Sequence, residues 1–208
     1  MLDIENSIIT LDAMGCQKAI AEQIIKQKAD YILALKGNHS GMQAELEAWW
    51  HKSQREGLSE STFEKHTEIS TGHGRIETRT CHQLLVDKSW LAKAYQWTGL
   101  KSIIKINAQV HDKSTGKDTE ETRWFISSLG LNAEQALNAV RNHWQVESMH
   151  WVLDMTFRED ESRIRKKQGP LVFNVMRKIA MALFKQDETK SASMARKKKM
   201  AGLDDKYR

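Results

Sequence analysis

One stretch of the chain, HWQVESMHWVLDMTFREDESR (residues 143–163), carries carboxylate and imidazole groups at helical spacing. At about 100° per residue, five of its side chains share one helix face that is roughly 80° wide. We call this set the polar stripe: His143, Glu147, His150, Asp154 and Arg158. Apolar residues border the stripe on both sides, whereas an ordinary amphipathic helix has a single apolar face. Since burying unpaired charge is costly, we expect these groups to lie exposed in a cleft or to have partners.

A second acidic group, Asp12, follows the short β-branched run at residues 8–11. Carboxylates at a strand end and on a distant helix can converge, and the hard cations Mg²⁺ and Mn²⁺ prefer such oxygen ligands. Two such ions about 4 Å apart can activate a hydroxyl and stabilise the leaving oxygen of a phosphodiester. Asp12 and Glu147 are therefore the candidate metal ligands. Two simpler roles stay open: Asp12 as the cap of the helix that follows it, and Glu147 paired with His143 or His150 one turn away.

Other site chemistries have weaker support in the sequence. Glu147 and His150 have the Glu-x-x-His spacing of di-iron carboxylate bundles, but those sites need a second copy of the motif and the chain has none. No nucleophile elbow is present for serine chemistry. The two cysteines, Cys16 and Cys81, lack paired spacing, which fits a reducing compartment and gives no zinc-finger signal.

The elements that would position Asp12 are predicted in residues 7–38. An apolar run, an amphipathic helix and the second apolar run YILAL read as strand, helix and strand. Two continuous apolar strands joined by a helix predict a parallel pair that is buried on both faces. Asp12 follows the first strand, and Lys36 and Asn38 follow the second. Because sites in open α/β sheets form at the carboxyl ends of strands, this edge is where we expect chemistry.

A β-rich middle is predicted after a helix at residues 39–53, for which Ser40 is a possible cap. Residues 75–86 alternate like a strand. Residues 100–111 and 119–129 are typical of a hairpin around the polar turn DKSTGK.

The last third of the chain is predicted to begin with two helices and to end in a disordered tail. One helix begins near Asn132, and a second covers residues 171–186 with Pro170 at its first turn. Beyond Asp187 the composition turns to Ser, Lys and Arg, and we expect disorder in much of this tail.

Composition favours a globular protein with an anionic partner. The 208 residues are 40% hydrophobic, which suffices for a core, and no run of about 18 apolar residues or signal-peptide pattern occurs. We therefore expect a cytoplasmic protein without membrane contact. The formal net charge is +5, and basic residues collect late in the chain, in RIRKK (163–167) and RKKK (196–199). Such runs favour binding to nucleic acid, although a solvated surface stays an alternative.

Five segments in this order, TLDAMGCQKAIAEQI, DYILALKGN, GHGRIETR, WFISSL and HWQVESMHWVLDMTFREDESRIRKK, resemble the bacterial insertion-sequence transposases of the H-repeat-associated group. The resemblance runs from about residue 1 to AGLDDKY near the end. These proteins are similar to other DDE transposases, which have a ribonuclease H-like α/β core with three acidic residues that bind Mg²⁺ or Mn²⁺.

The resemblance implies an α/β fold with an incomplete ribonuclease H-like core, whose first strands are missing, and an inserted β-rich region. Residues 1–58 would form the second half of the core, and residues 59–130 the insertion. Residues 131–186 would supply the C-terminal core helices with the catalytic glutamate, and residues 187–208 a basic, disordered tail.

The resemblance also assigns roles to individual residues. Asp12 resembles the second acidic residue of the triad and Glu147 the third. His143, His150 and Asp154 would hold Glu147 in place or touch the phosphate backbone. Candidate DNA contacts are basic or amide side chains, each of which could instead be plain surface: Lys36, Asn38, Arg75 and Arg79, the last two on one face of a strand, with Arg163, Arg165, Lys166 and Lys167.

The chain departs from the family at the first acidic residue. Asp3 does not match it, because Asp3 precedes an apolar run and does not lie within one. Two hypotheses follow. The chain would not cleave DNA alone, because two carboxylates would hold the metals poorly. It would also be marginal as an independent fold, because four apolar residues would lack strand neighbours: Ile8, Ile9, Leu33 and Leu35.

The function that the resemblance implies is that of a transposase, or of its C-terminal part, that cuts DNA at the ends of an insertion sequence and joins them to a target. Its partners would be double-stranded DNA, as element ends and target, and further copies of the chain, and it would lie at the nucleoid when bound. The alternative is a catalytically inactive remnant that binds DNA or dimerises. A metal-dependent nuclease unrelated to transposition is a third possibility.

Overall fold

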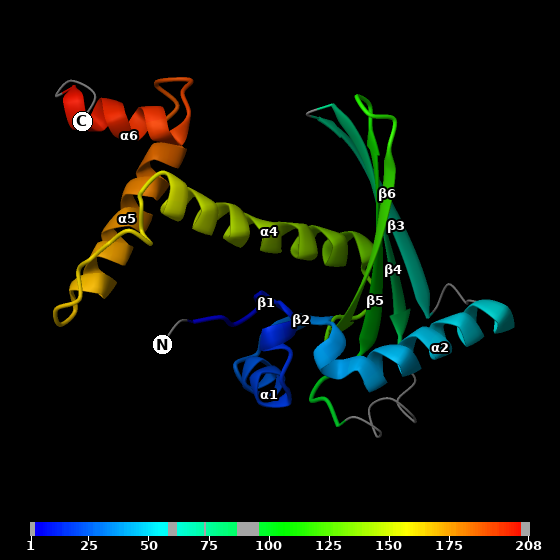
Figure 1. The fold of residues 1–208 in the computed structure, drawn as a ribbon. Coiled ribbons are helices and arrows are strands. Elements are labelled where there is room, and N and C mark those ends of the chain that lie inside the picture. Colours follow the sequence, from blue (N-terminus) through cyan, green and yellow to red (C-terminus); the bar gives the residue numbers. More distant parts are fainter. Residues whose placement is uncertain (1–2, 58–61, 73, 87–95, 205–208) are drawn as a thin grey trace. The chain divides into compact units, whose positions relative to one another are not determined.

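The computed structural model describes residues 3–57, 62–72, 74–86 and 96–204 (Figure 1). The chain divides into two compact units, Met1–His143 and Trp144–Arg208, and each is described by itself. The boundary falls inside one long helix, α4 (Ala133–Met155).

The first unit is built on a six-stranded mixed sheet in the order β1-β2-β6-β5-β4-β3. Helices on both faces make this a mixed α/β fold, as expected. Its strands are β1 (Ile8–Leu11), β2 (Asp30–Leu35), β3 (Phe63–Gly72), β4 (Arg75–Leu85), β5 (Ser102–Asp112) and β6 (Asp118–Ser127).

The predicted strand-helix-strand unit is confirmed. β1 pairs with β2 in parallel, from Ile8 opposite Asp30 to Leu11 opposite Leu33, and helix α1 (Lys18–Lys26) connects them. Parallel strands need such a crossover, and α1 supplies it by burying Ala21 and Ile24.

The expectation that four apolar residues lack strand neighbours is wrong for two of them. β2 has β1 on one side and an antiparallel partner, β6, on the other, with Leu33 opposite Ile126 and Leu35 opposite Trp124. Leu33 is fully buried and Leu35 nearly so. Ile8 and Ile9 lie on the edge strand β1, so they have a strand neighbour, β2, on one side only, and both are half-buried.

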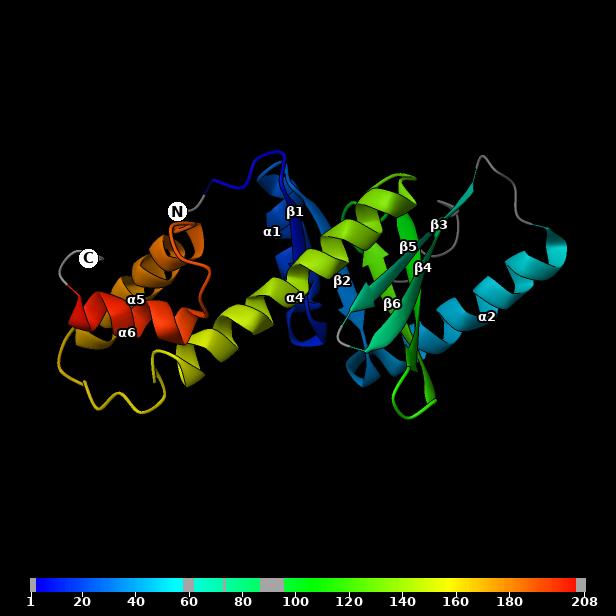
Figure 2. The same cartoon turned by 90° about the horizontal axis from the view of Figure 1, so that it is seen from above.

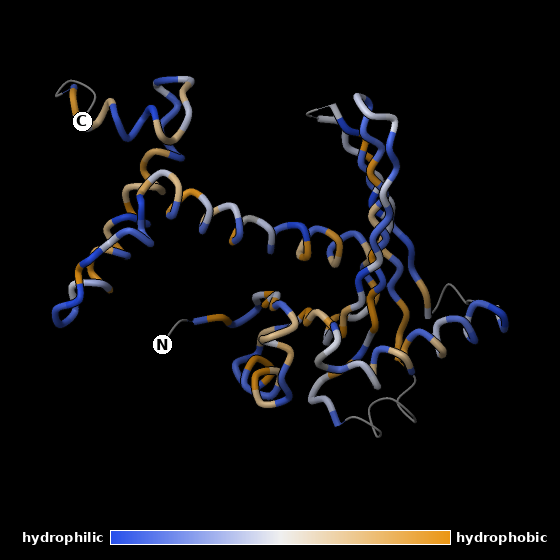
Figure 3. The backbone as a smooth tube through the Cα atoms, in the orientation of Figure 1, coloured by the Kyte–Doolittle hydropathy of each residue, from blue (hydrophilic) through white to orange (hydrophobic). Residues whose placement is uncertain are grey.

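The predicted hairpin is also confirmed, since β5 and β6 pair antiparallel around residues 113–117. A second hairpin joins β3 to β4, and the sequence had given no strand boundaries for β3. Towards both hairpin ends the strands become hydrophilic, whereas the other halves of β4–β6 are hydrophobic (Figure 3). The buried positions follow the same division, because β6 is exposed over its first five residues and buried over its last four.

Two hydrophobic clusters cover the two faces of this sheet. On one face, α1 and α2 (Ser40–Glu56) pack through residues such as Ile24, Leu46 and Trp50. On the other face, the first turns of α4 pack through Ala136, Leu137 and their neighbours (Figure 2). The predicted cap of α2 is wrong by one residue: Ser40 is the first helical residue, and His39 precedes it without a capping side-chain bond.

A buried amide fixes the start of α4. Gln83 is fully buried, and its amide nitrogen donates to Ser102 Oγ at 2.9 Å and to the Gly130 carbonyl at 2.7 Å. Its amide oxygen accepts the Asn132 backbone N–H at 2.8 Å, while the Asn132 side chain caps Gln135. A fully satisfied buried amide is directional, so it holds the first turn of α4 against β4. The helix begins at Ala133, as predicted near Asn132.

The second unit contains the rest of α4, followed by α5 (Gly169–Gln186) and α6 (Met194–Leu203). Pro170 lies in the first turn of α5, as predicted. The expectation of disorder beyond Asp187 is wrong for residues 194–203, which form α6. Lys197 is the reason, because its buried ammonium donates to the Phe184 and Asp187 carbonyls and so ties α6 to the end of α5. No helix in the described part of the chain is long and apolar enough to span a membrane.

Aromatic rings on the α2 face of the sheet enclose a histidine. Trp50 packs edge-on against His82 at a centroid distance of 5.4 Å, and Phe63 stacks on the same imidazole at 6.0 Å. Burial, together with the ammonium groups of Lys65 and Lys105, lowers the pKa of His82 to about 4. The folded state therefore holds this ring neutral at pH values where the unfolded chain protonates it.

We expect this histidine to make stability depend on pH. The unfolded-state pKa is near 6.5 and the folded pKa is lower, so the unfolded chain binds the extra proton and stability falls as pH drops from about 6.5 to about 4. His82→Phe keeps an aromatic ring but cannot protonate, and should reduce this loss by about 1–2 kcal/mol. Urea denaturation at pH 7 and pH 4.5 measures the loss. His51→Phe, at an exposed position on α2, is the control, and an equal effect of both substitutions would contradict the assignment.

Candidate active site

Asp12 lies at the carboxyl end of β1, where sequence reasoning placed it. It is exposed, and its Oδ1 accepts the Gly15 backbone N–H at 3.1 Å, capping the short 3-10 turn Ala13–Gly15. Asp12 therefore caps this short turn and not the helix that follows, because α1 begins at Lys18 with Gln17 in the capping position and no side-chain cap bond. One carboxylate oxygen is fixed by this bond, and the other remains available for a ligand.

Gly15 allows this turn to close tightly. A Cβ at Gly15 would lie 3.0 Å from Leu11 Cβ and 3.2 Å from Leu11 Cδ1, closer than such atoms normally approach. The residue type at position 15 therefore helps to hold the Asp12 carboxylate at the strand end.

Glu147 lies on α4 and is exposed, as are His150 and Trp151 beside it. Asp154 is half-buried. Arg158 is not part of the helical face that carries the other residues of the polar stripe. The helix α4 ends at Met155, and Arg158 has a positive φ of 52°. Among the described residues, neither Asp12 nor Glu147 takes part in an ion pair that would occupy its carboxylate.

His143 has a partner that the sequence did not suggest. Its Nδ1 lies 3.1 Å from Thr10 Oγ1, and both residues are half-buried. A pairing of Glu147 with His143 was left open, but the hydrogen bond that the structure gives His143 is the one to Thr10. Thr10 is the single polar residue within the apolar run IITL, and that was the available signal.

The two candidate ligands belong to different units, Asp12 to Met1–His143 and Glu147 to Trp144–Arg208. Within the residues that the structure describes, no three His, Cys, Asp or Glu side chains gather as a metal-binding group. The chemistry of each donor nonetheless fits Mg²⁺ or Mn²⁺, because both are exposed carboxylates with hard oxygen atoms.

Of the candidate DNA contacts near the sheet, Lys36 is exposed and Asn38 lies in the short turn Gly37–His39. Arg75 and Arg79 lie on one face of β4, as predicted, but both have acidic partners. Arg75 Nε is 3.6 Å from Asp112, and Arg79 is 2.5 Å from Glu77 and only 26% exposed. Arg79 is therefore the weaker candidate for a phosphate contact.

The basic segment after α4 is open to solvent. Arg163, Arg165, Lys166 and Lys167 are all exposed, and the described contacts of Arg165 are to carbonyls of its own segment. On α6, Lys198 and Lys199 are exposed as well. These side chains carry positive charge without an acidic partner among the described ion pairs, which suits a polyanion.

The cysteines do not contribute chemistry. Cys16 and Cys81 are buried and unpaired, and burial raises the pKa of each thiol to about 12. They remain protonated near neutral pH and pack as small apolar groups.

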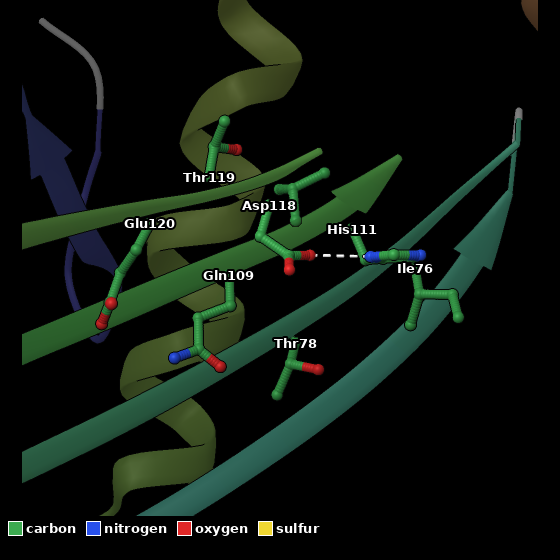
Figure 4. Close-up of a pocket in the computed structure, with 8 residues that line it drawn as sticks. Ile76, Thr78, Gln109, His111, Asp118, Thr119 and Glu120 are labelled. Carbon is green, nitrogen blue, oxygen red and sulfur yellow. Dashed lines mark hydrogen bonds and ion pairs between the residues drawn. The ribbon is translucent and has the colours of Figure 1, made fainter. Parts of the chain in front are cut away.

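An open groove of about 530 Å³ lies on the hydrophilic half of the hairpins, and it contains none of the residues predicted to be functional. His111 Nδ1 meets Asp118 Oδ1 at 2.7 Å in this groove, which Glu120 also lines (Figure 4). Two carboxylates would repel phosphate, so this groove is a poor candidate for the DNA site.

Comparison with known proteins identifies the class. The family model described as "Transposase DDE domain" matches residues 1–183, and the chain belongs to this family. The expected membership in the H-repeat-associated group agrees with the relatives. "Putative protein YbfL" of Escherichia coli K12 is 36% identical and the "H repeat-associated putative transposase YhhI" of the same strain 35% identical, each over the whole chain and 55% of the relative. "Putative transposase YncI" of E. coli O157:H7 is 34% identical over the whole chain and 53% of its own length. The chain thus spans about half the length of the curated relatives it matches.

We expect the capping role of Asp12 to be separable from its charge. Asp12→Ala removes the acceptor for Gly15 N–H and should lower the free energy of unfolding by about 1 kcal/mol. Asp12→Asn keeps an acceptor oxygen and should change it by only a few tenths. Urea denaturation of both variants tests this. If the two variants are equally stable, the capping bond contributes nothing measurable.

Proposed function

We propose that this chain supplies two of the metal-binding carboxylates, Asp12 and Glu147, of a transposase that cleaves DNA at the ends of an insertion sequence and transfers the freed strand to a target. The observation that carries the proposal is the family match over residues 1–183, which includes both carboxylates. An incomplete ribonuclease H-like core formed by the β1–α1–β2 unit and α4 is part of the same proposal.

The exposure of both carboxylates supports the proposed roles. Asp12 has one oxygen committed to Gly15 N–H and one available, whereas Glu147 projects from a helix without a described acidic or basic partner. Divalent cations, when bound, supply activation of the attacking oxygen and stabilisation of the leaving oxygen in an in-line displacement. The protein's own contribution is to hold the two carboxylates. His150 and Asp154, one and two turns beyond Glu147, would steady that carboxylate or contact the DNA backbone.

The deciding experiment measures Mn²⁺ binding to the chain by the loss of the free-ion electron paramagnetic resonance signal. Asp12→Asn and Glu147→Gln each remove a charged ligand while keeping shape, and each should weaken Mn²⁺ binding at least about tenfold. Glu134→Gln, at an exposed position in the first turn of the same helix, is the matched control and should bind like the wild type.

The alternative function makes the opposite prediction in the same assays. A non-catalytic remnant that binds or bridges DNA would bind duplex DNA equally well with a chelator present and with Glu147→Gln. It would also show no Mn²⁺ binding that depends on Asp12. That combination of results would overturn the proposed metal role and favour the remnant.

We expect the basic segment after α4 to supply much of the affinity for DNA. Replacing its four cations by glutamine should reduce the slope of log K against log salt by about 3 to 4, because each neutralised phosphate contributes about 0.9. Fluorescence anisotropy with a labelled duplex, measured at salt concentrations from about 50 to about 200 mM, gives this slope. The four positions are Arg163, Arg165, Lys166 and Lys167.

A second variant with the same change in net charge controls for the overall field of the protein. It replaces four exposed lysines of the first unit, and its slope should change by less than about 1. Equal slopes for the two variants would mean that binding responds to total charge and has no preferred segment. The control positions are Lys26, Lys52, Lys113 and Lys117.

A further inference from the structure

Helix α5 of the second unit exposes a row of large apolar side chains. At about 100° per residue, five of them share an arc of the helix that is roughly 100° wide. We call this set the α5 seam: Val172, Val175, Met176, Ile179 and Leu183. All five are exposed, and the exposed fraction reaches 56% for Met176 and 61% for Leu183. An apolar helix face is normally a packing surface, so this one calls for a partner.

The contacts of α5 within its own unit lie on the other side of the helix. Asn174 and Arg177 both interact with Glu159. The Phe184 ring stacks on Phe157 at a centroid distance of 6.4 Å. On the same helical projection, the three residues of α5 that make these contacts lie roughly opposite the seam. In the described part of the second unit, the seam therefore stays uncovered.

The uncovered apolar surface is as large as one side of a stable interface. Leu171 and Phe173 border the seam and are exposed as well. If a fully exposed large apolar residue presents roughly 200 Å², these seven half-exposed residues leave on the order of 700 Å² uncovered. The largest apolar patch of a typical monomer covers about 300–600 Å², whereas each partner in a stable complex buries about 800 Å².

The first unit offers no matching apolar surface in its described ranges. The large apolar side chains that are exposed there are Met14 and Ile69. They lie on separate elements, the turn Ala13–Gly15 and the strand β3. Two separate side chains cannot cover a seam that extends over three helical turns.

A second copy of the seam does match it. The charged residues of α5 lie outside the arc of the seam: Arg177, Lys178 and Lys185. A surface without cations does not suit a phosphate backbone. Apolar side chains at three- and four-residue spacing interdigitate when two helices pair, and in a two-fold arrangement the same patch serves both copies.

Charge selects the direction of such a pair. The basic segment RIRKK ends at Lys167, just before α5 begins at Gly169. Parallel helices would bring the two basic segments together. Antiparallel helices would separate them by about 27 Å, the length of an 18-residue helix, which is well beyond the screening length of about 8–10 Å.

We infer that α5 pairs antiparallel with α5 of a second copy of this chain, through the α5 seam. In this arrangement Val172 faces Leu183 of the second copy, and Met176 faces Ile179. The inference goes beyond the proposed function and does not depend on it, because the seam contains no proposed metal ligand or DNA contact.

Sedimentation velocity of the full chain over a range of concentrations tests the pairing. The wild type should approach twice the 23.9 kDa mass of one chain. The double variant Met176→Gln with Ile179→Gln should raise the dissociation constant at least about hundredfold, because the two-fold axis repeats each loss. Both positions are exposed and glutamine is a good helix former, so the variant should keep the circular dichroism spectrum of the wild type.

A matched control removes the same kinds of side chain from another helix of the same unit. Val146→Gln with Met155→Gln replaces one β-branched residue and one methionine at exposed positions of α4, and it should pair like the wild type. Equal weakening by both double variants would overturn the inference. A wild type that stays at the mass of one chain, or that assembles beyond a dimer, would overturn it as well.

Cross-linking tests the direction of the pair and does not depend on the glutamine variants. Cys16 and Cys81 are buried, so a cysteine placed on the exposed seam should react selectively with a short bismaleimide. An equimolar mixture of Val172→Cys and Leu183→Cys chains should give several-fold more cross-linked dimer than either variant alone. Equal yields in the three samples, or a higher yield in a single variant, would contradict antiparallel pairing.

Salt distinguishes this pairing from DNA binding. Each copy carries a formal net charge of +5, so two copies repel and added salt should strengthen their association. DNA binding by the basic segment should weaken over the same range. Association that weakens as salt is added would indicate an interface of ion pairs and would overturn the apolar seam as its basis.

Discussion

The placement of β2 between a parallel neighbour and an antiparallel one is the constraint on which the rest of the first unit depends. β2 is almost fully buried, with Tyr31, Ile32 and Leu33 each at 1% exposure or less. Its backbone pairs with β1 from Asp30 to Leu33 and with β6 from Ile32 to Leu35. Hydroxyls reinforce the β6 side, where Ser127 Oγ donates to the Tyr31 carbonyl at 2.8 Å. A one-residue slip would exchange the two faces of the strand. It would move Tyr31 and Leu33 out of the cluster under α1 and α2, and Ile32 out of the cluster under α4, so the packing of both faces fixes the register. Everything attached to β2, including the strand that precedes Asp12, takes its place from that register.

The sheet accounts for the apolar start of the helix face that carries the polar stripe. Taken alone, a helix face with two imidazoles and two carboxylates between apolar flanks is expected to lie exposed in a cleft or to have partners. In the folded chain the same face begins as a packing surface, with Ala133 and Ala136 fully buried, and becomes polar at His143. The point of change is where α4 meets the edge strand β1. Glu147 itself is exposed, so a ligand role would require no burial of charge.

Sequence reasoning succeeded where the signal is local. Continuous apolar runs predicted β1 and β2, the turn DKSTGK predicted the β5–β6 hairpin, and Pro170 predicted the start of α5. It gave no boundaries for β3, because that edge strand alternates mainly polar residues and leaves Ile69 69% exposed. It missed α6 because a run of lysines has the composition of a disordered segment, and the contacts of Lys197 with the end of α5 are invisible in the sequence. The ties that position α4 were beyond reach for the same reason, since the partners of Asn132, Arg141 and His143 lie 49, 73 and 133 residues away.

The two proposed ligands are held in different ways. Asp12 is fixed locally, because its own carboxylate closes a tight turn at which Gly15 permits the close approach of Leu11. Glu147 has no such local restraint among the described contacts and takes its position from the helix that carries it. A helix packed through alanines tolerates small shifts at low cost, so its accuracy must come from directional bonds at a few places. Gln83 provides one at the start of α4, the ion pair of Arg141 with Glu68 of β3 provides a second, and the Thr10–His143 bond provides a third. The part of α4 that belongs to the first unit is thus held on the sheet by directional bonds at its start and at its end, with apolar packing between them.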